Sequence, residues 1–430
     1  MTSRAKKLLI ISQVFLPDPA SVGQHMGDVA LAMRRRGHEV FVYASNRGYE
    51  DPKRKYAAHE FIEGVEIRRL PLSSFGKASI FKRLIGTVSF MLQCFFVALT
   101  SRGVDGILFS TSPPMVGFVV TLAAKLRGIP TAYWAMDLNP DQLIALKKIK
   151  PHGLPARFLS GINRFILRNT SLVIALDRFM AERLQRYTRI DSKLLVLPPW
   201  PHETVIEDVP AETNPFRKTH GLCGKFVVMY SGNHSPSNPL ATLLRATLRF
   251  RDDDRVRFLF VGGGLGKREV ESFIKEHDLT NAFSLPYQPL AELRYSLSAA
   301  DVHVVSLGSD MVGVIHPCKV YGAMAVSRPV LFFGPKPSHI ADLLDEHFFG
   351  WEVAHGDVDR AEKAIRSAMQ LPPAELKQVG CTGLGLLQQR LSQDYLCTRF
   401  CEALELRLQL GSPAVESSAK ETAACEPSFA

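Results

Sequence analysis

Short apolar segments alternate with helical segments along most of the chain, and this alternation restricts the fold more than any other feature. Before residue 200 the predicted strands are Leu8–Ser12, Glu39–Ala44, Gly106–Thr111, Pro130–Ala135, Ser171–Leu176 and Leu194–Leu197. After residue 220 they are Lys225–Tyr230, Val256–Val261, Ala282–Leu285, Asp301–Ser306, Pro329–Phe333 and Trp351–Val353. Short apolar strands separated by helices are typical of a parallel sheet covered on both faces. Two such arrays predict an α/β protein with two Rossmann-like doubly wound parallel-sheet domains that face a cleft.

A segment without periodicity separates the two arrays. Residues 197–215 are rich in proline and acidic residues, as expected of an interdomain linker. The chain therefore divides into a first domain over 1–200 and a second domain over 201–385. Apolar residues then recur at helical spacing, so a single C-terminal helix within 386–410 is expected to pack back toward the first domain. The small and polar residues of 411–430 predict a disordered tail.

The charge is distributed unevenly between the two halves. The first 200 residues contain 29 Lys and Arg and 14 Asp and Glu, a net charge of +15, whereas the remaining residues contain 23 and 28, a net charge of −5. A nucleic acid, an anionic membrane surface and a phosphorylated lipid would each suit the basic half. The seven cysteines are scattered without the spacing of a zinc ribbon, so we expect reduced thiols and no metal site.

An uncharged segment lies inside the basic half. Leu84–Ser101 has no charged residue over 18 positions and follows Lys82 and Arg83. This length just reaches that of a membrane-spanning helix. Three alternatives are open: a buried or partly exposed domain helix, a helix that dips into one leaflet, and a spanning helix, which would put parts of one sheet on opposite sides of a membrane. At the N-terminus, the apolar run Leu8–Ser12 is short and β-rich, so it predicts a buried strand rather than a signal peptide.

Small polar turns follow several predicted strands, where a ligand can approach the backbone closely. The candidates in these turns are Gly23, Gln24 and His25 after the first strand, Gly232, Asn233 and His234 after the first strand of the second domain, Gly263 and Lys267 after the next strand, and Pro286, Tyr287 and Gln288 after the one that follows. Each turn alone is weak evidence, since a simple loop or a surface histidine explains it equally well. The glycine spacing near Gly263 does not match a dinucleotide fingerprint.

The most specific segment is Gly313–Ala325, with the sequence GVIHPCKVYGAMA. A loop ending in Pro317, Cys318 and Lys319 is predicted to run into a short helix that includes Tyr321. Lys319 would then lie where a helix begins, beside free backbone N–H groups. That combination is suited to a diphosphate.

Four segments, in order along the chain, resemble those of a known family. They are the N-terminal part through Gly37, Trp134–Asp141 (WAMDLNPD), Tyr230–Asn233 (YSGN), and the stretch from Pro317 (PCKVY) through Pro329. Each segment is weak alone, but together they span both domains. The chain resembles the retaining glycosyltransferases of family 4, which have the two-domain architecture called GT-B. It is most similar to the branch that includes colanic-acid and N-acetylfucosamine transferases of bacterial surface-polysaccharide synthesis.

This resemblance implies a hexosyl- or N-acetylhexosaminyl-type glycosyltransferase that moves a sugar from a nucleotide diphosphate, with UDP sugars as the expected donors, to a lipid-linked or saccharide acceptor. The donor would lie mainly on the second domain, with Lys319 at the diphosphate and the turn 286–288 against the base. Gly23 and its neighbours would close over the phosphates, and the acceptor would lie near Asp137. The implied catalytic residues are Asp137 and Lys319. The implied donor-binding residues are Gly23, Gln24, His25, Gly232, Asn233, His234, Gly263, Lys267, Pro286, Tyr287, Gln288, Pro317, Lys319 and Tyr321.

The expected partners and location rest on the resemblance together with the one-sided charge and the apolar segment beside Lys82 and Arg83. The reaction would need no cofactor and no metal, because the nucleotide sugar is a co-substrate. The partners would be that donor, a polyprenyl-linked or saccharide acceptor and an anionic membrane surface, and not a nucleic acid. We expect a cytoplasmic protein bound peripherally to the inner face of the membrane, because the donor is cytosolic and the expected acceptor is a lipid.

Two departures from the family pattern leave other functions open. Many members carry two glutamates eight residues apart, at the positions of Val314 and Gly322 here, and many carry Arg and Lys near the positions of Asn233 and Asn238. A nucleotide-sugar epimerase of the same architecture is one alternative, although it would need paired acids and bases in the cleft. A catalytically degenerate partner of an active enzyme is another. Asp137 also has a structural alternative, as a helix cap or an Asx turn.

Overall fold

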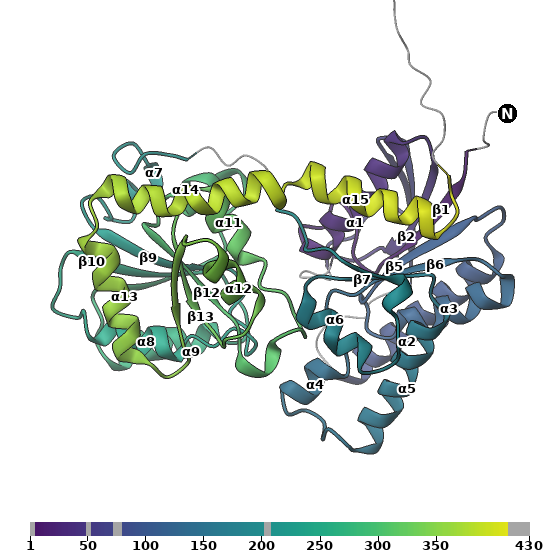
Figure 1. The fold of residues 1–430 in the computed structure, drawn as a ribbon, viewed down its shortest axis with the longest axis horizontal. Helices are drawn as coiled ribbons and strands as arrows, with labels where there is room; N and C mark the ends of the chain where they lie inside the picture. Colours follow the sequence, from purple (N-terminus) through teal and green to yellow (C-terminus); the bar gives the residue numbers. More distant parts are fainter. Residues whose placement is uncertain (1–4, 49–52, 72–79, 202–207, 412–430) are drawn as a thin grey trace, which may run out of the picture.

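The computed structural model describes residues 5–48, 53–71, 80–201 and 208–411. It contains two α/β lobes side by side, each built on one sheet with helices packed against it (Figure 1). The predicted fold class is therefore confirmed. The tail predicted over 411–430 lies, apart from its first residue, outside the described residues.

The first sheet has eight strands within the described ranges. They are β1 (Lys7–Ile11), β2 (Glu39–Ser45), β3 (His59–Ile62), β4 (Val65–Leu70), β5 (Gly106–Ser110), β6 (Thr131–Trp134), β7 (Leu172–Ala175) and β8 (Leu194–Val196), in the order β3-β4-β2-β1-β5-β6-β7-β8. All neighbouring pairs are parallel except β3 with β4. Strands β5, β6 and β7 are buried at every residue, as expected of strands covered on both faces.

The hairpin of β3 and β4 at the edge of this sheet is not predicted from the sequence. Its turn consists of Glu63 and Gly64, whose φ angles of 46° and 81° suit a two-residue hairpin turn. The residues of β3 alternate between exposed and half-buried and form no apolar run. An antiparallel edge strand can leave one face in solvent, so a search for buried runs overlooks it.

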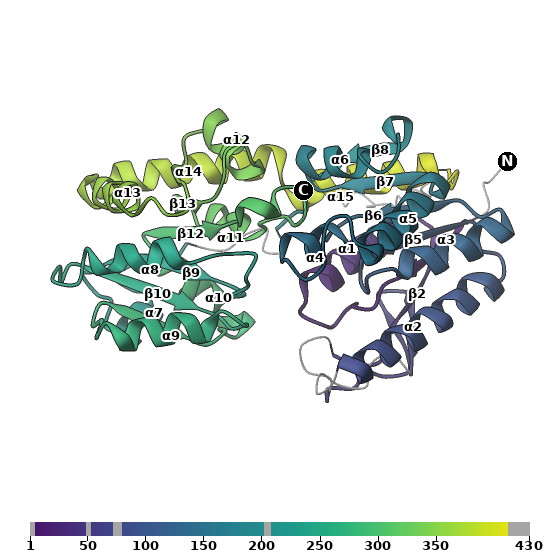
Figure 2. The same ribbon diagram turned by 90° about the horizontal axis from the view of Figure 1, so that it is seen from below.

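Helices cover both faces of the first sheet. They are α1 (Ser21–Arg35), α2 (Ile80–Thr100), α3 (Val116–Arg127), α4 (Asp141–Ala145), α5 (Leu154–Asn169) and α6 (Arg178–Gln185). Helices α2, α3 and α5 lie side by side in one layer, whereas α1 lies on the opposite face, against the C-terminal helix α15 (Gln393–Arg407) (Figures 1 and 2). None of the helices in the described ranges has the length and apolar character needed to cross a bilayer.

The second sheet is parallel throughout. Its strands are β9 (Phe226–Ser231), β10 (Val256–Val261), β11 (Ala282–Leu285), β12 (Val302–Ser306), β13 (Val330–Phe333) and β14 (Gly350–Val353), in the order β11-β10-β9-β12-β13-β14. This is the strand order of a dinucleotide-binding fold. The order reverses between β9 and β12.

The helices of the second domain fall into groups by the core they share. They are α7 (Pro215–Thr219), α8 (Ala241–Leu248), α9 (Lys267–Glu276), α10 (Leu293–Ser298), α11 (Lys319–Ala325), α12 (His339–Glu346), α13 (Val358–Gln370) and α14 (Pro373–Arg390). Helices α8, α9 and α13 share one core with the sheet, and α7 and α10 share another. Apolar side chains of α11, α12 and α14 belong to a cluster that continues through α15 into the first domain.

The chain crosses twice between the domains. The first crossing follows β8, and the second runs from α14 into α15 across both lobes (Figure 1). The prediction of a single helix within 386–410 is wrong, because α14 ends at Arg390 and the separate helix α15 begins at Gln393. Leu391 and Ser392 lie between the two helices. The Ser392 side chain accepts a hydrogen bond from the Tyr395 N–H and so caps a new helix.

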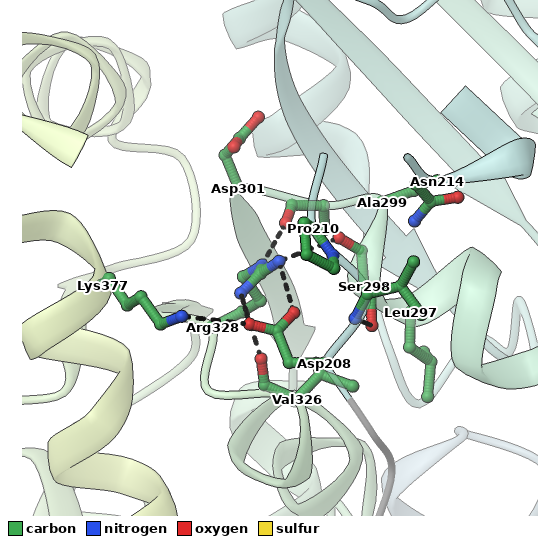
Figure 3. Close-up of polar contacts among 12 residues, drawn as sticks. Asp208, Pro210, Asn214, Leu297, Ser298, Ala299, Asp301, Val326, Arg328 and Lys377 are labelled. Atoms are coloured by element: carbon green, nitrogen blue, oxygen red, sulfur yellow. Dashed lines mark hydrogen bonds and ion pairs between the residues drawn. The ribbon is translucent and has the colours of Figure 1, made fainter. Parts of the chain in front are cut away.

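Arg328 binds the chain that follows the first crossing to the second domain. Asp208, which begins the described chain after the first crossing, accepts two hydrogen bonds from the Arg328 guanidinium, at 2.8 and 3.1 Å (Figure 3). The same carboxylate lies 3.6 Å from the Lys377 ammonium on α14. The guanidinium also donates to the carbonyls of Ser298 (3.0 Å) and Ala300 (2.7 Å). One arginine close to the end of α11 therefore holds the chain after the first crossing to the second domain.

Candidate functional site

The loops at the carboxyl ends of β9 and β12 meet where the second sheet reverses its strand order. In open α/β sheets, ligands bind at this reversal, outside the carboxyl ends of the strands. The loop after β9 begins at Gly232, and helix α11 begins at Lys319 after the loop that follows β12. Two of the predicted donor-binding residues thus occupy the expected place.

Lys319 lies across the backbone of Gly232. A side chain at residue 232 would collide with Lys319 Cε, and the φ of Gly232, +136°, is one that other residues rarely adopt. The Lys319 ammonium lies 5.4 Å from the ring centre of Tyr230. Within the described ranges it has no hydrogen bond and no carboxylate partner, and burial lowers its pKa to about 8. A half-buried ammonium without a counter-ion is suited to bind an anion.

The loop after β9 is held by one hydrogen bond from the end of its own strand and by another to the loop after β10. The Tyr230 hydroxyl donates to the carbonyl of Asn233 (2.7 Å), and the N–H of His234 donates to the carbonyl of Gly263 (2.6 Å). His234 is buried, its Nε2 has no hydrogen-bond partner, and burial lowers its pKa. It lines a pocket of about 270 Å³ between the starts of α8 and α9, which also includes Asn238 but not Lys319.

The turn after β11 adjoins the turn after β10. The Tyr287 ring lies directly over Gly263, where a Cβ atom would come within 2.9 Å of it. The Tyr287 side chain is 49% exposed. The Gln288 amide donates to the carbonyl of Pro286 (2.9 Å) and closes the turn. The structure therefore brings this predicted turn next to the loops around Lys319.

The Lys267 ammonium is already engaged by the backbone. It donates to the carbonyls of Gly262 and Leu285, at 2.9 Å each, and so joins the ends of β10 and β11. The N–H groups at the start of α11 are engaged too: those of Cys318, Val320 and Tyr321 donate to carbonyls two or three residues before them, at 3.0, 3.3 and 3.1 Å. The expectation of free N–H groups beside Lys319 is wrong for these three residues, because the tight turn uses them.

Asp137 follows β6 in the first domain. Its N–H donates to Thr111 Oγ1 (3.1 Å), and helix α4 has Pro140 at its N-cap with no side-chain cap, so Asp137 does not cap that helix. In the part of the chain that the structure describes, its carboxylate accepts no hydrogen bond, and burial raises its pKa to about 6. The helix-cap and Asx-turn alternatives therefore do not hold. The same described residues contain no group of three or more His, Cys, Asp or Glu that could hold a metal ion.

The first βα turn is occupied with internal contacts. A Cβ atom at Gly23 would come within 3.0–3.2 Å of the loop between β1 and α1. Both ring nitrogens of His25 lie near backbone carbonyls, Nε2 at 2.9 Å from Trp200 and Nδ1 at 2.8 Å from Ser21. The Gln24 amide donates to a carbonyl of the same turn (3.1 Å). These contacts hold the turn and the start of the linker. The predicted contact of Gly23, Gln24 and His25 with the donor stays a prediction.

A buried polar network joins the two domains beside Lys319. Asp177, at the N-cap of α6, lies 2.9 Å from Nδ1 of His316, whose Nε2 lies 2.8 Å from the Tyr321 hydroxyl. The ring of His339 packs on His316, with 4.6 Å between centroids. Tyr321 is therefore a buried partner of this network. The sequence analysis does not identify Asp177 or His316, although an acid directly after a predicted strand and a histidine next to Pro317 are visible signals.

Hydrogen bonds to backbone carbonyls also join the domains around Val314, the position of the first missing glutamate. The N–H of Leu138, next to Asp137, donates to the carbonyl of Val314 (3.0 Å). The Arg183 guanidinium of α6 donates to the carbonyl of Val312 (2.6 Å). The Val314 side chain is fully buried, so this position supports the contact between the domains. At Gly322, the position of the second missing glutamate, a Cβ atom would meet nothing nearer than 3.8 Å.

Comparisons with known proteins agree with this architecture. Residues 21–200 match the model of the glycosyl transferase 4-like domain. The chain is 26% identical over 331 residues to the glycosyltransferase WbjE of Pseudomonas aeruginosa, covering 76% of this chain and 80% of that one. It is 25% identical over 385 residues to WcaI of Escherichia coli, named as a colanic acid biosynthesis glycosyl transferase, covering 85% and 93%.

Solved structures share the fold at low sequence identity. HepE of Anabaena, solved in complex with UDP and glucose, is 16% identical with a TM-score of 0.68, covering 93% of this chain and all of that one. WaaG, a glycosyltransferase involved in lipopolysaccharide biosynthesis, is 14% identical with a TM-score of 0.66, covering 92% and 98%. The matched domain and the two relatives support a glycosyltransferase, and the solved structures share its GT-B fold. The chain is thus similar to the family 4 glycosyltransferases of the colanic-acid-like branch.

Proposed function

We propose that the protein transfers a sugar from a uridine diphosphate sugar to a lipid-linked or saccharide acceptor, with retention of configuration, in surface polysaccharide synthesis. The observation that carries the proposal is the Lys319 ammonium, half-buried and without a counter-ion in the described ranges, above the backbone of Gly232. A diphosphate supplies the missing negative charge. A uridine donor is favoured because the structural relative HepE binds UDP and UDP-glucose.

In the proposed reaction, the bond between the anomeric carbon and the diphosphate breaks, and negative charge develops on the diphosphate. Lys319 stabilises this charge, which is the largest contribution expected in such a site. The acceptor hydroxyl attacks from the face that the diphosphate leaves, and its proton passes to a phosphate oxygen of the donor. Asp137, whose carboxylate has no internal partner among the described residues, orients the acceptor hydroxyl. The proposal includes no metal ion and no other cofactor.

The first domain is proposed to bind an anionic membrane, at the inner face where donor and lipid acceptor meet. Helix α2 supports this because its two sides differ. The side that faces the core contains Phe90, Cys94 and Ala98, which are all 0% exposed. The other side contains Ile85 (44% exposed), Val88 (48%), Leu92 (54%) and Phe96 (58%). The uncharged segment thus has both a core face and an apolar face open to lipid, inside the half of the chain with a net charge of +15.

Lys319→Ala tests the proposed function. We expect turnover with a UDP sugar to fall by at least about 100-fold, as when an electrostatic stabiliser is removed from other active sites. Lys319→Arg keeps the charge and should retain more activity. Lys275→Ala, an exposed lysine of α9 in the same domain, is the matched control and should leave turnover unchanged. A folded Lys319→Ala enzyme with full turnover would refute the assignment.

Two further assays distinguish the alternatives. Incubation with the donor alone separates a transferase from an epimerase, because an epimerase converts the nucleotide sugar without an acceptor. Calorimetry with uridine and guanosine diphosphate sugars separates an enzyme from a degenerate partner. Binding of none of these compounds would contradict the proposal.

A further inference from the structure

A basic pocket opens between the domains at the end of α4. Its volume is about 720 Å³, and its walls come from α4 and the following turn, from α6, and from the second domain. The pocket runs along α4 from its first residue, Asp141, to the turn that follows the helix. Asp137 lies four residues before α4 begins, so Asp137 and this turn are at opposite ends of the short helix. Residues that line the pocket include Asp141, Lys147, Lys148, Lys150, Arg183, Ser309 and Asp310.

The positive charge of this pocket is only partly compensated. Its three lysines are exposed and have no ion-pair partner among the described residues. The Asp141 carboxylate is already bonded to Arg183 (3.4 Å) and to the Tyr187 hydroxyl (2.5 Å), which leaves Asp310 as the other acid at the pocket. Between residues 142 and 176 the sequence contains six Lys and Arg and no Asp or Glu. A pocket of this kind suits an anion with more than one charge.

The lysines project from an ordered turn. Lys147 has a positive φ of 55°, and the N–H groups of Lys147 and Lys148 donate to the carbonyls of Ile144 (2.9 Å) and Leu143 (2.8 Å). The carbonyl of Lys150 accepts a hydrogen bond from the N–H of Gly153 (3.1 Å). A backbone that is already ordered does not have to lose conformational entropy when the turn binds a ligand.

Two apolar side chains are exposed directly after this turn. Leu154, at the start of α5, is 80% exposed, and Phe158 is 69% exposed. Residues four positions apart share one face of a helix. Exposed apolar residues beside a group of lysines are typical of an element that contacts a lipid surface. The combination of a diphosphate-sized charge site and an apolar face fits an isoprenoid diphosphate better than a nucleotide or a nucleic acid, which would leave the apolar face unused.

We propose that this pocket binds the diphosphate of a polyprenyl-diphosphate-linked acceptor, with Lys147, Lys148 and Lys150 on the phosphates. The isoprenoid chain leaves along Leu154 and Phe158 into the bilayer. Helix α4 is about 8 Å long at the usual rise per residue, so the saccharide on this diphosphate extends along α4 toward Asp137. The inference rests on the proposed transfer to a lipid-linked acceptor and adds the site at which the carrier is recognised.

Calorimetric binding of farnesyl diphosphate, in the presence of saturating UDP, tests this site. UDP occupies Lys319, so a second diphosphate must bind elsewhere. The triple variant Lys147→Ala/Lys148→Ala/Lys150→Ala is expected to raise the Kd of farnesyl diphosphate by at least about tenfold, because charge-assisted contacts to the phosphates are lost. The matched control changes three exposed lysines of the second domain to alanine and should leave the Kd unchanged; these are Lys218, Lys275 and Lys363.

A second pair of variants separates lipid from free diphosphate. Leu154→Ser/Phe158→Ser should weaken farnesyl diphosphate several-fold and leave inorganic diphosphate unchanged, whereas Leu406→Ser, 74% exposed on α15, should affect neither. Equal binding of farnesyl diphosphate to the wild type and the triple lysine variant would overturn the proposal. Equal binding of farnesyl and inorganic diphosphate to the wild type would overturn its lipid part. Failure of UDP itself to bind in the same titration would contradict the proposed function instead.

Discussion

The carboxylate of Asp177 in the first domain lies 2.9 Å from Nδ1 of His316 in the second, and both side chains are almost completely buried. His316 precedes Lys319 by three residues and also contacts the hydroxyl of Tyr321, at 2.8 Å. Burial would raise the pKa of Asp177, but the hydrogen bond to His316, the charges of His316 and His339 and the hydrogen bond from the Met180 N–H together outweigh burial and hold this pKa below its usual range. The position of the Lys319 loop is therefore linked to the position of the first domain.

Separating this pair should reduce catalysis more than donor binding. We expect His316→Ala and Asp177→Ala each to lower turnover by about 10- to 100-fold, because the catalytic groups of the two domains lose their relative placement, while the Kd of UDP changes less. A double-mutant cycle on the free energy of unfolding should give a coupling of about 1–3 kcal/mol. If the two single substitutions change the free energy of unfolding in a strictly additive way, the two side chains act independently.

Donor binding should weaken at high pH. Burial lowers the pKa of Lys319 to about 8, so the ammonium is present below that pH and is lost above it. Since the diphosphate needs the cation, the Kd of UDP should be constant near pH 7 and rise about tenfold per pH unit above pH 8. Calorimetry between pH 7 and 9.5 measures this. The Lys319→Arg variant keeps its positive charge over this whole range, so its Kd for UDP should not change with pH. An equally steep rise of the Kd in that variant would show that another group titrates.

Most of the strands predicted from the sequence are buried, and their burial follows from the local pattern. Strands such as β5 and β7 are covered on both faces, so every residue is apolar or small and the run is visible. Lys319 could be predicted for a similar reason, because a basic residue after a proline at the start of a helix is a local feature. The β3–β4 hairpin could not, since its outer strand is half in solvent.

Contacts between distant residues explain what the sequence does not predict. Asp177 and His316 are 139 residues apart and meet only when the domains pack together. The sequence predicts His25 from its place in a βα turn, but it does not show that Nε2 of this histidine lies 2.9 Å from the carbonyl of Trp200, 175 residues away. Such a histidine has the same local sequence whether it faces a ligand or the linker. Lys267 is a similar case, since its ammonium donates to the carbonyl of Leu285, 18 residues away, as well as to that of Gly262.

Asp137 should give the enzyme an acid limb near pH 6. Burial raises its pKa to about 6, so the carboxylate needed to orient the acceptor is lost below that pH. We expect kcat/KM to fall below about pH 6, and Asp137→Asn to lower turnover by about 100-fold and remove this limb. The same variant should raise Tm at pH 8, because the unpartnered carboxylate destabilises the folded state above its raised pKa, and this gain should vanish as the pH falls toward 4. A variant that is less stable at pH 8 would contradict the absence of an internal partner.

Glu405 should stabilise the contact of α15 with the first domain. Burial would raise its pKa, but hydrogen bonds from Arg36 (2.8 and 2.5 Å) and His38 (3.0 Å) lower it below the ordinary value of 4.5. A lowered pKa means that this stabilisation is present above pH 4.5 and is lost as the pH falls through the folded-state value. Glu405→Gln should lower the free energy of unfolding at pH 7 by about 3 kcal/mol. Denaturant titrations from pH 7 to 3 should show the difference from the wild type closing below pH 4.5, whereas a constant difference would indicate a packing effect alone.

The exposed face of α2 should bind anionic membranes. We expect the protein to float with anionic vesicles at low salt and to be released as salt is added, because charge attraction is screened within about 10 Å at 0.1 M ionic strength. Leu92→Ser/Phe96→Ser removes two apolar side chains that are 54% and 58% exposed, so it should reduce flotation without disturbing the core. Phe90 is unsuitable for this test because it is fully buried. Phe348→Ser, with a phenylalanine 58% exposed on the second domain, is the matched control and should float like the wild type. A wild-type protein that stays in the soluble fraction at low salt would refute membrane binding by this domain, and equal flotation of the α2 variant and the control would assign binding to charge alone.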